Sequence, residues 1–282
     1  MWKIAVVVVT RNNCDMLKQL INDLEKQTFK PKQIWIIDNA SSDGTEAFLQ
    51  NFSPPFFYVR FSQNTGSAGG YYEGILRAKQ DNDAVWLLDD DVTVSENALE
   101  ELVKHLDLLV KKKPIGAVRS WCASDCPYKE PFCTDSFAWR GTLITEEAIS
   151  TVGLPQRDYF LYADDTEYAL RIKEAGFSIF WVPSSRVIEK RLADKELIGK
   201  GVFKTTLVRE PAKLYYAFRN QLHVGIKYKK WWQVVKTFLF AVKVIFVFSL
   251  GKRKESEKII AVKLALKDGF CGRLGRHPHY IL

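Results

Sequence analysis

The sequence has few of the features that would cross-link the chain or direct it out of a cell. It contains five cysteines, and the three closest together, Cys122, Cys126 and Cys133, are not spaced as CxxC and have no histidine nearby. This pattern favours free thiols in a reducing compartment over disulfides or a zinc site. Met1 leads directly into an apolar β-type run, without a charged n-region and a cleavage site, so we expect no export signal.

Internal repeats and low-complexity segments are also absent, and the charge is distributed unevenly. The 282 residues, 47% of them hydrophobic, suffice for one domain with an appendage. Residues 213–282 carry 15 Lys+Arg against 3 Asp+Glu, and the remainder is slightly acidic. A basic tail suggests a polyanion or an anionic membrane surface as its partner. Nucleic acid is the rival polyanion, but no recognition motif for it is present, so we expect no nucleic-acid partner.

Short apolar runs alternate with helical patterns through much of the chain. The runs lie at residues 4–9, 33–37, 56–61, 85–88, 115–118 and 177–182. Uninterrupted apolar runs are typical of strands buried on both faces of a sheet. The alternation predicts an α/β fold, a doubly wound Rossmann-like sheet flanked by helices, with ligands at the carboxyl ends of the strands.

Three adjacent carboxylates, Asp89, Asp90 and Asp91, follow the run at 85–88. Packing alone does not favour them there, because like charges repel and each is costly to desolvate. A divalent metal with oxygen ligands is the simplest group that would neutralise them. The alternative is a polar loop in which Asp91 or Ser95 caps a helix over residues 96–110.

Polar residues follow other expected strands as well. Asp38 ends the second strand and is suited to accept a hydrogen bond from a base or ribose; the alternative is that Asp38 and Asp43 serve in turns and caps. The stretch 64–70, NTGSAGG, lets backbone approach a ligand closely, and the helix after it offers N–H groups to phosphate. Glycine loops are also common as simple tight turns.

A second carboxylate pair, Asp164 and Asp165, follows the aromatic run 159–162 and opens another expected helix. Two acidic clusters that each follow apolar sequence favour an active site more strongly than either cluster alone.

The stretch 231–250 contains only two ionisable side chains, Lys236 and Lys243, and is long enough to span a bilayer. Gln233 and Thr237 can share one helical face with the lysines, so an amphipathic helix in the headgroup plane is the favoured interpretation. A membrane-spanning helix and a helix packed on the protein's own body are the alternatives.

Seven segments, taken in order, resemble those of inverting glycosyltransferases of family 2 with the GT-A fold. They are VVVVTRNN, IIDNASSDGT, NTGSAGG, LLDDDV, FAWRGTLI, YADDTEYALRIKEAG and VPSSRVIEK. Within the family the sequence is most similar to bacterial galactofuranosyltransferases and rhamnosyltransferases that build polysaccharide on lipid carriers, and YYAFRN and DGFCGRLGR in the tail resemble theirs. The resemblance implies a mixed-sheet GT-A catalytic domain over residues 1–206 and a helical, amphipathic, membrane-associating extension over residues 207–282.

The resemblance also implies a role for each strand end. Asp91 would bind Mn²⁺ or Mg²⁺, and Asp89 and Asp90 would contact the metal or the nucleotide sugar. Asp38 matches the residue that holds a pyrimidine base. The other implied nucleotide-sugar contacts are Thr10, Arg11, Asn39, Asn64 and Gly69.

The second acidic pair matches the family's catalytic position. Asp165 matches the general base, which takes the acceptor hydroxyl's proton as that oxygen attacks the anomeric carbon, and Asp164 is its neighbour. Trp139 and Tyr162 lie where an acceptor is expected. Similar enzymes have a metal-binding histidine where this chain has Glu189, which we expect to act as a substitute ligand. A solvated surface glutamate is the alternative.

The expected activity is transfer of a sugar, with galactofuranose or rhamnose favoured, from a UDP- or dTDP-linked donor to a lipid-linked oligosaccharide in bacterial cell-surface polysaccharide synthesis. The expected location is cytoplasmic, peripheral on the inner face of the cell membrane, and a homo-oligomer is compatible with the sequence. Two other classes remain open. LLDDDVTV fits the DxDxT pattern of haloacid-dehalogenase-like phosphatases, although three β-α units precede it, and the missing histidine fits a non-catalytic scaffold on a GT-A fold.

Overall fold

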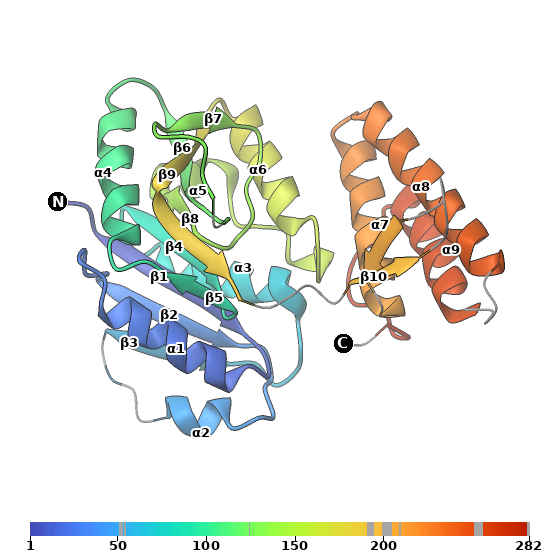
Figure 1. Ribbon diagram of the computed structural model, residues 1–282, viewed down its shortest axis with the longest axis horizontal. Coiled ribbons are helices and arrows are strands. Elements are labelled where there is room, and N and C mark those ends of the chain that lie inside the picture. Colours follow the sequence, from blue (N-terminus) through green and yellow to red (C-terminus); the bar gives the residue numbers. More distant parts are fainter. Residues whose placement is uncertain are drawn as a thin grey trace. The chain divides into compact units, whose positions relative to one another are not determined.

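The structure is a computed structural model that describes residues 1–50, 53, 55–123, 125–190, 195–198, 205–208, 210–250 and 256–280. The chain forms two compact units (Figure 1): the first comprises Met1–Gln156 and Asp165–Arg191, and the second Arg157–Asp164 and Leu192–Leu282. The short segment 157–164 therefore packs with the C-terminal part of the chain. The division into a catalytic domain and a membrane-associating extension stays a prediction, since compact units describe packing and not activity.

A mixed sheet forms the centre of the first unit (Figure 1), in the order β3-β2-β1-β4-β8-β6-β9-β5, with β7 paired to β9. Its strands are β1 (Ile4–Thr10), β2 (Gln33–Asp38), β3 (Phe56–Arg60), β4 (Ala84–Asp89), β5 (Val92–Val94), β6 (Ile115–Trp121), β7 (Phe132–Thr134), β8 (Thr142–Thr145) and β9 (Ser178–Glu189). Strand β1 is parallel to β2 and β4, whereas β8 is antiparallel to β4 and β6.

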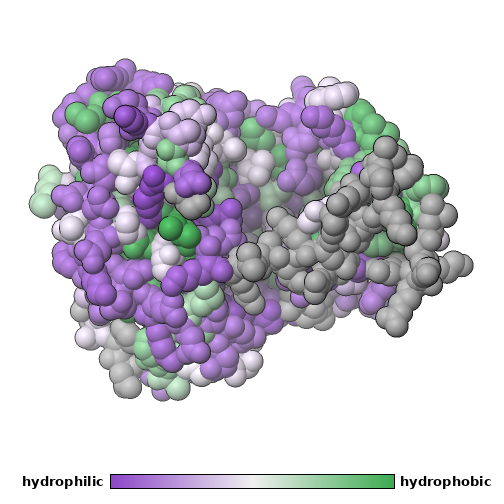
Figure 2. Space-filling view, viewed as in Figure 1, coloured by the Kyte–Doolittle hydropathy of each residue, from purple (hydrophilic) through white to green (hydrophobic). Residues whose placement is uncertain are grey.

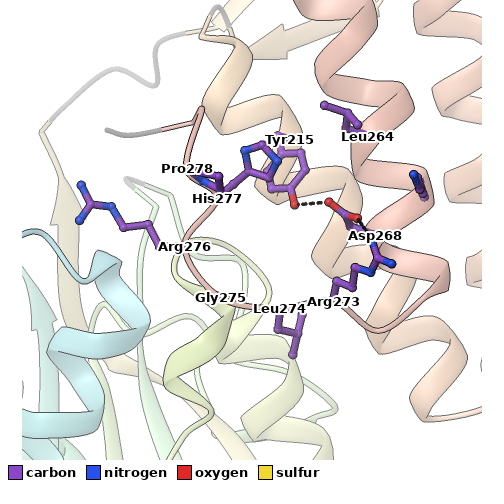
Figure 3. Close-up of a pocket in the computed structure, with 10 residues that line it drawn as sticks. Tyr215, Leu264, Asp268, Arg273, Leu274, Gly275, Arg276, His277 and Pro278 are labelled. Atoms are coloured by element: carbon purple, nitrogen blue, oxygen red, sulfur yellow. Dashed lines mark hydrogen bonds and ion pairs between the residues drawn. The ribbon is translucent and has the colours of Figure 1, made fainter.

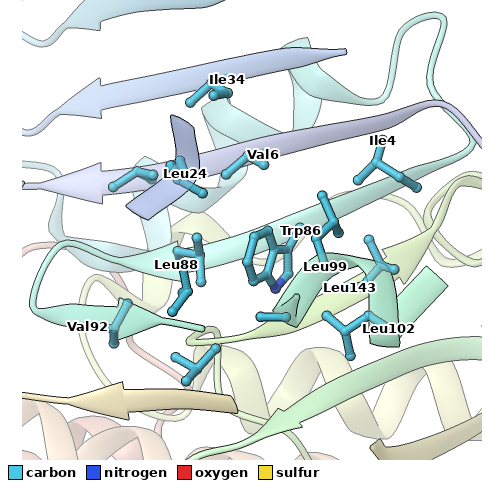
Figure 4. Packing of buried hydrophobic residues seen from close by; sticks show 14 of the residues in the cluster. Ile4, Val6, Leu24, Ile34, Trp86, Leu88, Val92, Leu99, Leu102 and Leu143 are labelled. Atoms are coloured by element: carbon cyan, nitrogen blue, oxygen red, sulfur yellow. The ribbon is translucent and has the colours of Figure 1, made fainter. Parts of the chain in front are cut away.

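Helices cover both faces of this sheet. They are α1 (Cys14–Glu25), α2 (Thr45–Leu49), α3 (Gly66–Ala78), α4 (Ala98–Val110), α5 (Glu146–Val152) and α6 (Asp164–Glu174). In β1, Val6 and Val8 enter the hydrophobic cluster that includes residues of α1 and α4 (Figure 4), whereas Ala5 and Val7 enter the cluster that includes residues of α3, α5 and α6. Because successive side chains of a strand point to opposite faces, the uninterrupted apolar run is buried on both sides, as predicted.

The second unit contains the 3-10 helix η1 (Arg157–Tyr159), the antiparallel hairpin of β10 (Lys195–Ile198) and β11 (Thr205–Val208), and the helices α7 (Pro211–Lys227), α8 (Trp231–Leu250) and α9 (Ser256–Phe270). Its own hydrophobic cluster joins Phe160 to residues of all three α-helices. Tyr215 of α7 donates a hydrogen bond of 2.7 Å to buried Asp268 of α9 (Figure 3), which links two helices of this unit.

Helix α8 has one packed face and one exposed apolar face. The packed residues are Val234, Ala241, Val244 and Phe248. The most exposed ones are Val235, Phe238, Leu239, Val242 and Phe246, with Trp231 and Trp232 at the start of the helix, whereas Phe240 is 36% exposed. The spacing of Val235, Phe238, Leu239, Val242 and Phe246 places them on one side of the helix. Figure 2 shows hydrophobic surface on the second unit. In the part of the chain that the structure describes, this is the helix long and apolar enough to cross a membrane: Trp231–Ser249 has a mean hydropathy of 1.6, with 22% of the span buried.

Candidate active site

The carboxyl ends of β1, β2 and β4 lie at one edge of the sheet. In the strand register, Thr10 is beside Asp38, and Val9 is beside Asp89. Since parallel strands present their carboxyl ends at the same edge, the polar residues that follow them meet there. The structure thereby brings together the acidic, nucleotide-side and glycine-rich segments singled out in the sequence.

Asp90 and Asp91 lie in the turn between β4 and β5. Asp90 accepts hydrogen bonds from Thr10 Oγ1 (2.7 Å), the Arg11 backbone N–H (3.1 Å) and Asn13 Nδ2 (2.9 Å). Burial raises the pKa of Asp90, although these hydrogen bonds oppose the effect. Asp90 therefore ties this acidic turn to the turn that follows β1. Nucleotide contacts by Thr10, Arg11 and Asp90 stay predictions.

Glu189 lies across from the acidic turn at the end of β9. Val92 pairs with Glu189, and the Lys190 backbone N–H donates to the Asp91 carbonyl (2.8 Å). The Glu189 carboxylate forms an ion pair with Arg140 (3.4 Å). Within the described ranges, no three His, Cys, Asp or Glu side chains are grouped to hold a metal. Among the described residues, Asp89, Asp91 and Glu189 therefore do not form a preassembled metal site.

The capping alternative for this turn is wrong. Helix α4 begins at Ala98, and Asn97 occupies its cap position without a side-chain cap hydrogen bond. Ser95 Oγ instead donates weakly to the Arg186 carbonyl (3.4 Å).

Asp89 lies among several charged groups. Burial raises its pKa to about 6; the charges of Asp90 and Asp165 act in the same direction, while a hydrogen bond from Tyr71 and the charge of Arg140 oppose it. The Tyr71 hydroxyl donates to Asp89 Oδ1 at 2.6 Å. Asp89 and Asp165, which are far apart in the sequence, therefore act on each other within one unit.

Asp165 is the second residue of α6. Its Oδ1 accepts from the Thr166 backbone N–H (2.6 Å) and hydroxyl (3.1 Å). Burial raises the pKa of Asp165, and the cations Arg119 and Arg140 oppose the rise. A half-buried carboxylate of raised pKa is suited to accept a proton near neutral pH. The preceding Asp164 is 2% exposed, and its catalytic role stays a prediction.

Arg140 is a residue of the site that the sequence analysis did not single out. Its charge acts on Asp89, Asp165 and Glu189. It lies in the quoted segment FAWRGTLI. A cation placed between two acidic segments was the available signal.

Asp38 is fully buried, and its carboxylate accepts hydrogen bonds that stabilise the turn after β2. Its Oδ1 accepts from the Ser41 backbone N–H (2.8 Å), and its Oδ2 accepts from the Tyr58 hydroxyl (2.8 Å) beside Arg60 (3.5 Å). Asp43 likewise accepts from a helix-start N–H and a threonine hydroxyl. The turn and cap alternative thus describes both residues, and a contact between Asp38 and a base stays a prediction.

Asn39 fixes the start of the glycine-rich loop. It accepts from the Thr65 backbone N–H (2.7 Å) and donates to the Gly66 carbonyl (2.8 Å), while Asn64 accepts from the Gly66 N–H (2.9 Å). Gly66 has a φ of +74°. A Cβ on Gly69 would lie 2.4 Å from Thr65 Oγ1. Close packing therefore accounts for Gly69, and phosphate or ribose contact by Asn39, Asn64 and Gly69 stays a prediction.

The two predicted acceptor residues lie in different units. Trp139 is 5% exposed, and its ring stacks on Tyr71 with centroids 4.8 Å apart, inside a hydrophobic cluster of the first unit. Tyr162 belongs to the segment 157–164 of the second unit. Packing accounts for most of the Trp139 ring, and acceptor contact by either residue stays a prediction.

Residues 5–120 match glycosyl transferase family 2. Galactofuranosyltransferase GlfT1 of Mycolicibacterium smegmatis is 22% identical over 251 residues, which cover 77% of this chain and 81% of that protein. A GalNAc(5)-diNAcBac-PP-undecaprenol beta-1,3-glucosyltransferase of Campylobacter jejuni is 30% identical over 108 residues, covering 37% of this chain and 34% of that protein. The chain therefore carries a family 2 glycosyltransferase domain and is a glycosyltransferase, as predicted. The match includes the strand that carries Asp89, which favours this class over the phosphatase.

Solved structures share the fold. The mannosyltransferase PcManGT of Pyrobaculum calidifontis, in complex with GDP-Man and Mn²⁺, has a TM-score of 0.62 at 14% identity, covering 96% of this chain and 88% of that one. GalNAc-T7 with UDP, GalNAc and Mn²⁺ has a TM-score of 0.61 at 16% identity, covering 96% of this chain and 56% of that one. The predicted GT-A fold is confirmed.

Proposed function

We propose that the chain is an inverting, metal-dependent glycosyltransferase that moves a sugar from a nucleoside diphosphate to a lipid-linked glycan. The observation that supports this most directly is the electrostatic coupling of two acidic groups from distant parts of the chain. The charge of Asp165 raises the pKa of Asp89, and Arg140 lowers the pKa of both. A single displacement at an anomeric carbon needs a base that takes the acceptor's proton, which we assign to Asp165. It also needs groups that hold the donor, to which we assign Asp89.

Asp165 is assigned as the general base. When an acceptor hydroxyl attacks the anomeric carbon, its proton must leave as the new C–O bond forms. Burial raises the pKa of Asp165 above its ordinary value, which suits a group that takes a proton, and the charges of Arg119 and Arg140 oppose the rise. Attack from the face opposite the departing diphosphate inverts the anomeric configuration.

Mn²⁺ or Mg²⁺ suits the chemistry of the acidic turn, because Asp89, Asp91 and Glu189 offer hard oxygen ligands. Such ions are commonly held by one or two carboxylates together with substrate phosphates, in accord with the lack of a complete protein site within the described ranges. When bound, the metal supplies charge stabilisation for the leaving diphosphate. The Arg140 guanidinium, which faces Glu189, offers further positive charge there.

Galactofuranose is the favoured donor sugar, with rhamnose as the alternative, and UDP or dTDP as the nucleotide. Support comes from the galactofuranosyltransferases of two mycobacterial species among the relatives. A lipid-linked acceptor is supported by the undecaprenol diphosphate in the name of the Campylobacter protein. An abequosyltransferase of Salmonella is also similar over its matched part, in accord with a role in surface polysaccharide synthesis.

The proposed location is the inner face of the membrane. Helix α8 exposes Phe238, Leu239, Val242 and Phe246 on one side, and the tail is strongly basic. An apolar face flanked by cations binds an anionic membrane surface through both burial and charge. The purified protein should bind anionic vesicles, leave them at high salt and bind neutral vesicles poorly; equal binding to both would contradict electrostatic seating. Self-association stays a prediction.

The direct test is a donor screen that measures nucleoside diphosphate release with Mn²⁺ and a lipid-linked acceptor. Asp165→Asn should lower kcat by at least 100-fold while it retains nucleotide binding. NMR of the product should show the anomeric configuration opposite to that of the donor. If none of the tested donors releases nucleoside diphosphate and no nucleotide binds, the non-catalytic scaffold is favoured. Full activity of Asp165→Asn would overturn the base assignment.

A further inference from the structure

The backbone just before the proposed base adopts an unusual conformation. Phe160, Tyr162 and Ala163 have φ angles of +65°, +66° and +61°. None of them is glycine, and residues with a Cβ are disfavoured in this left-handed region because the Cβ crowds the backbone. Such a segment persists only when its surroundings hold it in place. Helix α6 starts directly after it, at Asp164.

The carbonyl groups of this segment converge on one side chain of α7. Asn220 Nδ2 lies within hydrogen-bond distance of the carbonyl oxygens of Tyr159 (2.9 Å), Leu161 (2.7 Å) and Tyr162 (2.9 Å), and its two N–H groups are shared among them. Asn220 is fully buried, so water does not replace these partners. A single amide group thus fixes the path of the chain across the left-handed residues.

Arg219, the neighbouring residue on α7, orients that amide. Its Nε donates to Asn220 Oδ1 (2.7 Å), which sets the amide end that faces the segment. Its Nη2 donates to the Tyr159 carbonyl (2.9 Å), and its Nη1 donates to the Gly275 carbonyl (2.6 Å). Arg219 is 1% exposed, and a buried guanidinium is tolerated only when its donors are satisfied.

Two aromatic contacts complete the same face of α7. The ring of Phe160 packs against that of Tyr216 with centroids 4.6 Å apart, and the Tyr159 hydroxyl hydrogen-bonds His223 Nδ1 (2.8 Å). The four α7 residues, Tyr216, Arg219, Asn220 and His223, are spaced i, i+3, i+4 and i+7, which places them on one helix face. That face contacts the segment 159–162, and its Arg219 and Tyr216 also hydrogen-bond residues between 275 and 280.

We propose that this face of α7, with Asn220 and Arg219 at its centre, positions Asp165 for proton transfer by fixing the segment that leads into α6. The inference rests on the proposed function, in which Asp165 is the general base. Asn220 is assigned no contact with substrate; it is a positioning residue that acts through the conformation at Ala163. Ala163 directly precedes Asp164, the first residue of α6, so a change of backbone conformation at residue 163 acts on the first turn of that helix.

The test compares Asn220→Asp with Gln221→Ala. Asn220→Asp keeps the size and the oxygen that accepts from Arg219, but it presents a carboxylate oxygen, in place of the amide donor, to three carbonyl groups. We expect kcat to fall at least tenfold while the donor KM and nucleoside diphosphate binding change less than twofold. Gln221→Ala is the matched control on α7, because Gln221 accepts from Gln233 (2.9 Å) in another helix; its kcat should stay within twofold of wild type.

A rescue variant separates positioning from general destabilisation. Glycine adopts positive φ as readily as negative φ, so Ala163→Gly in the Asn220→Asp background should recover kcat at least threefold. If Asn220→Asp fails to fold by circular dichroism, Arg219→Lys, which removes the guanidinium fork, is judged by the same criteria.

The outcomes separate this inference from the function beneath it. An unchanged kcat, a parallel loss of nucleotide binding, or no rescue by Ala163→Gly would overturn the positioning role. If the wild-type protein has no transferase activity, the proposed function is wrong. If Asp165→Asn is fully active, the base assignment is wrong.

Discussion

Of the three adjacent acids Asp89, Asp90 and Asp91, Asp90 should contribute most to the free energy of unfolding. The substitution Asp90→Ala tests this. The substitution removes the acceptor of hydrogen bonds from Thr10, the Arg11 backbone and Asn13. Hydrogen bonds to charged groups each contribute about 1.5–3 kcal/mol. Because burial of the carboxylate already raises the pKa of Asp90, part of that gain is offset, and we expect a net loss of about 3 kcal/mol in the free energy of unfolding. This corresponds to a fall in Tm of about 6–12 °C.

The measurement is urea unfolding followed by tryptophan fluorescence, to which fully buried Trp86 on β4 contributes. Asp91→Ala is the comparison in the same turn, and it should abolish metal-stimulated activity. A double-mutant cycle with Thr10→Val should give a coupling energy of at least about 1 kcal/mol for Asp90 and Thr10. Asp90→Ala at wild-type stability, or no coupling with Thr10, would refute the structural role of this carboxylate.

The further predictions concern the charged cluster. The proposed base, Asp165, must be ionised to take a proton, and burial raises its pKa, so kcat/KM should fall as pH drops through a value above the ordinary aspartate range. Arg140→Gln removes a cation that lowers this pKa, so the acid limb should move to higher pH; an unmoved limb would exclude an effect of Arg140 on the base. Tyr71→Phe removes a hydrogen bond that lowers the pKa of Asp89, now about 6, so the variant should lose more activity at pH 6 than at pH 8, and equal losses at both would count against this account. Glu189→Ala should raise the Mn²⁺ concentration for half-maximal activity severalfold, whereas an unchanged Mn²⁺ titration would show that Glu189 is no ligand.

The sheet of the first unit was largely predictable from the sequence. The apolar runs expected at 4–9 and 33–37 correspond to β1 (Ile4–Thr10) and β2 (Gln33–Asp38). Such strands are buried on both faces, so their sequence carries little ambiguity. The polar residues follow the runs directly, so the order of residues alone indicates which edge of the sheet carries them.

The apolar run at 177–182 predicted a strand that is too short; Pro183, which cannot donate a ladder hydrogen bond, follows this run. The strand continues to Glu189. Its pairing with β6 shifts register between Ser120 and Trp121, and Pro183 falls within that irregularity, where a regular ladder is not required. This continuation carries Glu189 to the acidic turn.

The division of labour among the acids was not predictable. Asp38 and Asp90 have the same side chain as Asp91, yet both accept hydrogen bonds from protein donors that lie up to 80 positions away. Only the folded chain brings Thr10 to Asp90 and Tyr58 to Asp38. The same holds for Asn220, whose three carbonyl acceptors lie about sixty positions earlier in the sequence.

The path of the chain has a consequence for how this protein can be shortened or recombined. The chain leaves its first unit after Gln156 and re-enters it at Asp165, so the C-terminal helices are not a detachable cassette. A fragment that ended after β9 would keep the residues before Asp165 but lose Arg219 and Asn220, and we expect it to bind nucleotide yet turn over poorly. We expect a tail from a related enzyme to support activity only where it also carries an α7 face that binds residues 159–162.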